Sequence, residues 1–133
     1  MSKDTSQNIA VVRGYFEAVE RGDLEAAGNA FAEDIVWHQP GNGSLSGTYE
    51  GTGAVFGLLG KFMERSAGSF RIDKFGPFMA QGDLVTTTLH FSAARESASM
   101  SMAGVDLLRL RQGKIQEVWL FSEDQNGEDK FWG

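Results

Sequence analysis

The chain has 133 residues, of which 41% are hydrophobic and 23% charged, with a formal net charge of −6 and no cysteine. These values are typical of one ordered globular domain, and they predict a single domain over residues 1–133. The negative charge argues against nucleic acid or an anionic membrane as a partner, and the lack of cysteine excludes disulfides, thiol catalysis and cysteine-based zinc sites.

The first half of the chain reads as mainly helical. Apolar residues at three and four spacing predict a helix over residues 6–21, a second short helix over 24–31 and a third over about 52–65. Residues 35–39 (IVWHQ) predict a short strand that stops at Pro40, and the glycine-rich segment 41–51 is expected to be a loop.

The second half reads as strands. Residues 69–81 predict a strand that Gly76-Pro77 bends or bulges, and residues 84–94, 98–111 and 115–123 predict three more, joined by tight turns. Helices followed by an antiparallel meander indicate an α+β fold, with three N-terminal helices packed on a curved antiparallel sheet. Such a sheet forms a cone whose mouth can hold a small molecule.

Asp106 lies on the apolar face of its predicted strand. The residues that share this face by alternation are Met100, Met102, Gly104, Asp106, Leu108 and Leu110. A buried carboxylate is unfavourable unless it is paired or protonated, and burial raises its pKa. A neutral acid in a pocket can donate a hydrogen bond to a developing oxyanion. The alternative is a structural role, in which Asp106 bonds a backbone amide or a helix end.

Tyr15 and His90 have both functional and structural interpretations. Tyr15 lies at the edge of the apolar stripe of the first helix, where its phenol is either a donor into the cavity or a polar tip at the surface. His90 shares a strand face with threonines and serine, so we interpret it as structural. The only two histidines, His38 and His90, lie on different elements and form no metal-binding motif, so no metal is predicted.

The chain ends in an acidic segment followed by two aromatic residues. Glu123 and Asp124 leave the last strand, and their simplest interpretation is a solvated acidic tail. Phe131 and Trp132 are expected to fold back onto the body or to pack on a partner, because two exposed aromatic side chains would form a hydrophobic surface patch.

Three stretches together resemble a known superfamily. These are YFEAVERGDLEAAGNAFAEDIVWHQPG, GTYEGTGAVFGLL and GVDLLRLRQGKIQEVWLFSEDQ. They look like the nuclear transport factor 2-like superfamily and, within it, are similar to SnoaL-like polyketide cyclases and ketosteroid isomerase-like proteins. The resemblance covers nearly the whole chain and implies the cone-shaped α+β barrel. It implies no single reaction, because this fold hosts isomerases, cyclases, dehydratases, epoxide hydrolases and non-catalytic binders.

The resemblance carries over to individual residues. Tyr15 and Asp106 match the tyrosine and the protonated acid that form the oxyanion hole in ketosteroid isomerases. Those isomerases place an acid directly before the proline, where this chain has Gln39, which cannot accept a proton. His38 is therefore the first candidate for the base. SnoaL-like cyclases place a catalytic acid late in the chain, which makes Asp124 or Glu123 a further candidate.

These observations lead to one leading hypothesis. We hypothesise that the chain is a cofactor-free enzyme of secondary metabolism. It would be a cyclase or isomerase that forms an enolate from a hydrophobic, polyketide- or steroid-like carbonyl compound. His38 would take the proton, and Tyr15 with Asp106 would stabilise the oxygen. The residues expected to line the pocket are Trp37, Gln39, Phe56, Phe62, Met63, Met102 and Trp119. The alternatives are a non-catalytic binding or accessory protein, and an epoxide hydrolase or dehydratase.

The sequence also suggests a location and an oligomeric state. The N-terminal stretch MSKDTSQNIA is polar, and no segment approaches the roughly 20 apolar residues that span a bilayer, so we expect a cytoplasmic protein. The resemblance implies a homodimer. The expected contact surface is the outer face of the strands, with Thr86, Thr88, His90, Val105 and Leu107.

Overall fold

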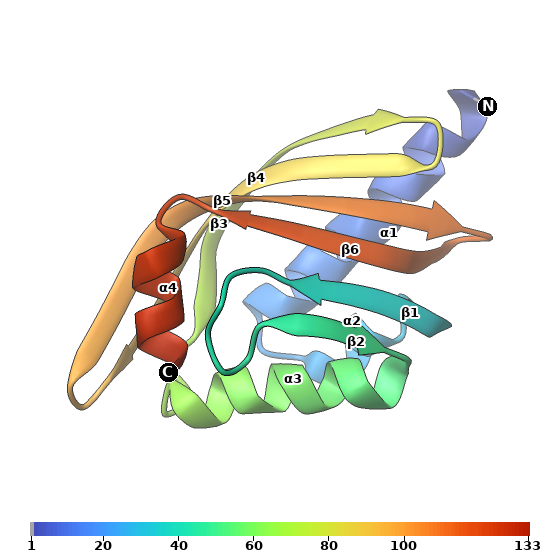
Figure 1. Cartoon of the computed structure of the whole chain (residues 1–133). Helices are drawn as coiled ribbons and strands as arrows, with labels where there is room; N and C mark the ends of the chain where they lie inside the picture. The colour runs from blue at the N-terminus through green and yellow to red at the C-terminus, as the bar shows by residue number, and fades with distance from the viewer. Residues whose placement is uncertain (1) are drawn as a thin grey trace.

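The computed structural model describes residues 2–133, and their side chains from Thr5 onwards. Helices cover a curved six-stranded sheet (Figure 1). The helices of the described residues are α1 (Ser2–Glu20), α2 (Leu24–Gly28), α3 (Thr52–Arg65) and α4 (Gln125–Trp132). The strands are β1 (Phe31–Gln39), β2 (Gly47–Glu50), β3 (Arg71–Gln81), β4 (Leu84–Arg95), β5 (Ala98–Arg111) and β6 (Lys114–Ser122). Among residues 2–133, no helix is both long and apolar enough to cross a membrane.

The predicted α+β architecture is confirmed, with one difference in the sheet. The strand order is β2-β1-β6-β5-β4-β3, and β3 to β6 form the expected antiparallel meander. The β1 and β6 strands, however, pair in parallel, because the chain crosses the whole sheet before β6 returns beside β1. The segment 41–51 is not entirely a loop either, because Gly47–Glu50 forms the edge strand β2 against β1.

The helices cover the concave face of the sheet. The α1 helix packs mainly on β3, α3 packs on β1 and β2, and α4 contacts β5 and β6. Figure 1 shows α4 standing across one end of the sheet, with the C terminus close to the end of α3. The residues that are fully buried between these layers include Val12, Phe16, Ile35, Val55, Leu58, Val85, Leu108, Ile115 and Val118. Beside this core, residues of α1, α3, α4 and the strands enclose a cavity.

The second helix is shorter than predicted. Asp23 caps it, since the carboxylate accepts a hydrogen bond from the Ala26 amide at 3.0 Å, but the helix ends at Gly28. Phe31 therefore opens β1 instead of closing the helix. A side chain at Gly28 would overlap the ring of Phe56, so this glycine allows α3 to approach closely.

A bulge of β3 and the packing of the C terminus both follow from residues named in the sequence. The β3 strand is bulged, as predicted around Gly76-Pro77, and it carries a further bulge between Ile72 and Lys74. At the C terminus, Phe131 and Trp132 are buried, which confirms that they fold back onto the body. The ring of Trp132 stacks on Phe62 of α3, with 4.7 Å between the centroids. The α4 helix thus closes one end of the cone.

Candidate active site

The concave face of the sheet holds a cavity of about 320 Å³, a volume suited to a small organic molecule. Its walls are mostly apolar and come from α1, α3, α4 and the strands. Six residues predicted for the site line this cavity: Tyr15, Trp37, Gln39, Phe62, Met63 and Asp106. Further lining residues include Leu59, Phe70, Arg71, Ile72, Leu89, Phe91, Leu120, Ser122, Glu128 and Trp132.

Asp106 projects from the middle of β5 into the cavity. Its residue is only 9% exposed, and its neighbours on the same face, Met102 and Leu108, are buried, as the alternation predicts. Burial raises the pKa of the Asp106 carboxyl to about 8, with a further contribution from the negative charge of Glu128. At neutral pH the carboxyl is therefore mainly protonated and can donate a hydrogen bond.

Tyr15 reaches the same cavity from α1. It is 5% exposed and is held by aromatic contacts with Phe16 and Phe31, whose centroids lie 5.2 and 5.6 Å away. Burial raises the pKa of the Tyr15 phenol, and the nearby Asp106 raises it further. Among residues 5–133, neither the phenol nor the Asp106 carboxyl has a side-chain hydrogen bond. Two neutral O–H donors therefore face the cavity.

A second carboxyl group, Glu128 of α4, lies in the cavity wall. It is 6% exposed and accepts four hydrogen bonds. Its Oε1 accepts from Ser122 Oγ at 2.6 Å and from Gln125 Nε2 at 3.2 Å. Its Oε2 accepts from Trp132 Nε1 at 3.1 Å and from Gln39 Nε2 at 3.4 Å. These donors hold the side chain in one orientation.

Gln39 connects β1 to this second carboxyl group. Its Oε1 accepts a hydrogen bond from Trp37 Nε1 at 3.0 Å, and its amide nitrogen donates to Glu128. Trp37 and Gln39 are both buried and point inward from β1. At the place where the resembled isomerases keep an acid, this chain therefore has an amide, which contacts an acid supplied by another element.

His38 lies on the other face of β1, between these two inward-pointing residues. Its Nε2 lies 2.6 Å from Glu117 Oε2, and its ring stacks on Trp119 with 5.5 Å between centroids. Arg109 also pairs with Glu117. Alternation along the strand directs His38 away from the cavity that holds Asp106. The expected role of His38 as the base in the pocket thus has no geometric basis.

Three residues expected to line the pocket lie elsewhere. Phe56 packs over Gly28 and beside Phe31, outside the cavity. Met102 is buried in the sheet opposite Phe91 and does not reach the cavity wall. Trp119 stands on the outer face of β6 with His38, because its neighbour Val118 takes the inward position.

The two late acids, Glu123 and Asp124, make structural contacts. Glu123 is exposed, and its carboxylate accepts a hydrogen bond from the Ala103 amide at 2.9 Å. Asp124 caps α4 by accepting from the Gly127 amide at 2.9 Å. Neither lines the cavity. The solvated tail predicted for this region is instead a short helix that carries the buried Glu128.

Sequence reasoning missed Glu128, and one signal could have found it. Glu128 and Trp132 are four residues apart, so on a helix they share one face. With Phe131 and Trp132 expected to fold back, an acid on the face of Trp132 would be carried into the body. That inference needed the C-terminal segment to be recognised as a helix, and a segment of eight residues with two acids and a glycine gave little sign of one.

Known proteins share this fold. The profile of the SnoaL-like domain matches residues 12–118. A protein of unknown function with a cystatin-like fold from Xanthomonas campestris is 46% identical, with 95% of this chain and 98% of that one covered and a TM-score of 0.91. A nuclear transport factor 2-like protein from Burkholderia xenovorans is 25% identical over 97% of this chain and 98% of that one, with a TM-score of 0.78. A candidate polyketide cyclase from Xanthomonas campestris is 18% identical over the same shares, with a TM-score of 0.72.

The profile spans most of the chain, and the matching structures share the curved sheet and its covering helices. The chain therefore belongs to the SnoaL-like family of the nuclear transport factor 2-like superfamily.

Proposed function

We propose that the chain is a cyclase or isomerase that forms an enolate from a hydrophobic, carbonyl-bearing small molecule, by acid and base chemistry that needs no cofactor. The observation that carries this proposal is the pair of neutral donors, Tyr15 and Asp106, which face an apolar cavity beside a buried carboxylate, Glu128. The similarity in fold to a candidate polyketide cyclase agrees with this class of substrate.

The donors act on the carbonyl oxygen. Hydrogen bonds from Tyr15 and Asp106 stabilise the negative charge that develops on this oxygen as the enolate forms, and the apolar walls strengthen both bonds. In an isomerisation the proton then returns to a different carbon. In a cyclisation the enolate carbon attacks a second carbonyl of the same molecule.

Glu128 is the proton acceptor in this proposal, in place of His38. Its carboxylate lies in the cavity wall, and its position is set by Gln39, Ser122, Gln125 and Trp132. It accepts the proton from the carbon next to the carbonyl, and the electron pair of that C–H bond moves toward the oxygen held by Asp106. Its charge also favours the protonated form of Asp106, so one residue supplies the base and maintains the acid.

A second candidate reaction is supported by the same two carboxyl groups. In the opening of an epoxide or the dehydration of an alcohol, protonated Asp106 gives its proton to the departing oxygen. Glu128 then accepts a proton from the attacking water, or from the carbon that loses it. The negative charge of Glu128 raises the pKa of Asp106, which favours a protonated Asp106 as the acid beside a charged Glu128 as the base.

Exchange of hydrogen for deuterium tests the first reaction without knowledge of the natural substrate. A panel of hydrophobic ketones, beginning with 2-tetralone, is incubated with the protein in D₂O, and loss of the α-proton signal is followed by NMR. Quenching of Trp37 and Trp132 fluorescence reports binding independently. We expect D106N and E128Q to slow exchange by about 100-fold or more, and Y15F by less.

The control variant is H38Q, which lies on the outer face and is expected to exchange at the parent rate. Ketones that bind without any accelerated exchange would favour the non-catalytic binding protein. Parent-like exchange in both D106N and E128Q would overturn the mechanism. Hydration of styrene oxide, followed in the same variants, separates the second candidate from the first.

Homodimerisation belongs to this proposal as well. The outer face of β5 carries Val105 and Leu107, and Phe121 of β6 is exposed beside Val105. Burial of these apolar side chains between two copies would favour association. Light scattering is expected to give twice the monomer mass, and V105D is expected to shift the protein to the monomer.

A further inference from the structure

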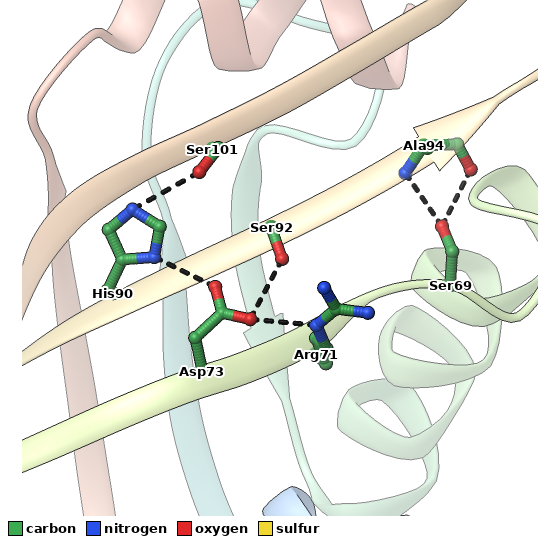
Figure 2. Close-up of polar contacts among 7 residues, drawn as sticks. All are labelled: Ser69, Arg71, Asp73, His90, Ser92, Ala94 and Ser101. Atoms are coloured by element: carbon green, nitrogen blue, oxygen red, sulfur yellow. Dashed lines mark hydrogen bonds and ion pairs between the residues drawn. The ribbon is translucent and has the colours of Figure 1, made fainter.

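A second group of reactive side chains lies on the outer face of the sheet, away from the cavity. Asp73 Oδ2 lies 2.8 Å from His90 Nδ1, and His90 Nε2 lies 3.2 Å from Ser101 Oγ (Figure 2). Because the carboxylate accepts the Nδ1–H, the Nε2 lone pair is directed at the hydroxyl of Ser101. Carboxylate, imidazole and hydroxyl thus form one hydrogen-bonded chain, which is the arrangement that activates a serine nucleophile.

Three neighbouring strands place these residues. His90 and Ser101 lie on the outer faces of β4 and β5, where Ser92 is directly opposite Ser101. On β3, Ile72 pairs with Phe91 and Lys74 with His90, so Asp73 is the extra residue of a bulge. A bulge sets two residues of one strand against one of the next and can re-aim a side chain. Here the bulge leaves Asp73 directed at the ring of His90.

Further contacts hold Asp73 in position. Its second oxygen, Oδ1, accepts hydrogen bonds from Arg71 Nε at 2.7 Å and from Ser92 Oγ at 3.1 Å. Partial burial raises the pKa of Asp73, but the hydrogen bonds from Arg71, His90 and Ser92 outweigh it and leave the pKa below its usual value. The carboxylate therefore stays charged and keeps the imidazole in the Nδ1–H form.

The chain of hydrogen bonds lines an open hollow. In the single chain the side chains of His90 and Asp73 are 31% and 27% exposed, so a solute can reach the ring while the strands keep its orientation. Val105, Leu107 and Phe121, where the dimer contact is proposed, do not line this hollow, so the proposal leaves His90 outside that contact. Arg71 lines this hollow and also the cavity described above. Its Nε is bound to Asp73, while the rest of the side chain, 69% exposed, offers its terminal N–H groups to a ligand.

We propose that Asp73, His90 and Ser101 form a second, nucleophilic site that accepts acyl groups from small esters. Ser101 Oγ attacks the ester carbonyl carbon while its proton passes to His90 Nε2, and the carbonyl electrons move onto the oxygen. Arg71 is the cation available to that oxygen. When the tetrahedral intermediate collapses, the C–O bond to the alcohol breaks and the alcohol leaves with the proton from His90.

The acyl group then remains on Ser101 until water removes it. Water gives one proton to His90 and its oxygen to the acyl carbon, the bond to Ser101 Oγ breaks, and the proton returns to the serine. The products are one alcohol and one carboxylic acid. His90, which the strand pattern placed among structural residues, is the base of this reaction, and Asp73 is a positioning residue that acts through it.

The test uses 4-nitrophenyl acetate with the whole chain. We expect a burst of up to one 4-nitrophenolate per chain, and peptide mass spectrometry is expected to locate the acetyl group on Ser101. S101A abolishes the burst and the label, and H90Q slows acylation by about 100-fold or more. S99A is the matched control, since Ser99 lies two residues earlier on the same face and makes no hydrogen bond with His90. An acetyl group found only at other residues, or an unchanged burst in S101A, overturns the proposal.

The role of Asp73 requires a separate measurement, because a structural change in the D73N variant alone could slow acylation. In D73N the ¹⁵N resonances of the His90 ring are expected to shift from the Nδ1–H form toward the other tautomer, with slower acylation and an unchanged circular dichroism spectrum. H38Q assigns the resonances, since the chain has only two histidines. An unchanged ring tautomer together with unchanged acylation would remove Asp73 from the site.

Discussion

Asp106 and Asp73 belong to the same sheet but lie on its opposite faces. Asp106 faces the apolar cavity, where burial and the charge of Glu128 raise its pKa to about 8. Asp73 faces outward, where donors from Arg71, His90 and Ser92 outweigh its partial burial and lower its pKa. The same residue type is thus prepared as a neutral proton donor on one face and as a charged hydrogen-bond acceptor on the other. The protonation state of each aspartate is therefore set by the face of the sheet on which it lies and by the hydrogen-bond donors around it.

The two histidines allow a similar comparison on the outer face alone. Each has a carboxylate partner, but His38 shares Glu117 with Arg109 and is stacked against Trp119. The other ring nitrogen of His38, Nδ1, lies 3.5 Å from Thr48 Oγ1, a long contact for a hydrogen bond. Only His90 therefore has both a tightly held carboxylate and a hydroxyl within 3.2 Å.

The largest expected effect is a difference in pH dependence between the parent and D106N. The unfolded chain releases the Asp106 proton near pH 4, while the folded chain keeps it until about pH 8, so rising pH removes stability in this window. The parent is expected to lose up to about 1.4 kcal/mol of unfolding free energy per pH unit more than D106N. Urea denaturation between about pH 5 and pH 8 measures this. If the free energy of unfolding varied with pH in the same way in the parent and in D106N, Asp106 would have an ordinary pKa.

A smaller effect is expected from the donors of Glu128. W132F keeps the aromatic stack on Phe62 but removes the N–H that bonds Glu128 Oε2. Because a buried charged acceptor loses a partner, the free energy of unfolding is expected to fall by about 1–3 kcal/mol. W119F, on the outer face, is the control and should change it by less than about 1 kcal/mol. Equal losses in the two variants would mean that the Glu128 bond contributes nothing specific.

On the outer face the sign of the pH effect reverses. Because the folded pKa of Asp73 lies below its unfolded value, its contribution is present above about pH 4 and is lost as pH falls through the folded pKa. D73N is therefore expected to be less sensitive to acid than the parent, by under about 1 kcal/mol, since the group is partly solvated. Thermal unfolding between about pH 2 and pH 5 tests this. A greater acid sensitivity in D73N would contradict the assigned direction.

The smallest effect is expected at His38. H38Q removes a partly exposed pair with Glu117, and Glu117 keeps its contact with Arg109. The free energy of unfolding should change by about 0.5 kcal/mol or less in chemical denaturation. A loss above about 2 kcal/mol would show that the His38 stack on Trp119 is part of the core rather than of the surface.

Much of the fold and part of the site could be predicted from local patterns. The alternation in β5 placed Asp106 on the buried face, and the helical stripe of α1 placed Tyr15 at its edge, because strand and helix periods decide which face a residue occupies. The same alternation in β1 sets Gln39 inward and His38 outward. The bounds of α3 and β5 follow their predicted ranges, since both patterns are long and end at clear turn residues.

Local sequence patterns therefore predicted the class of fold and the face on which each strand residue lies. Which distant side chains meet depends on how the elements pack. Glu128 reaches Gln39 because α4 folds back across the end of the sheet, and Asp73 reaches His90 because a bulge in β3 re-aims one residue. Local periodicity sets direction within one element. The docking of a short helix and the register between strands depend on the free energy of the whole assembled core.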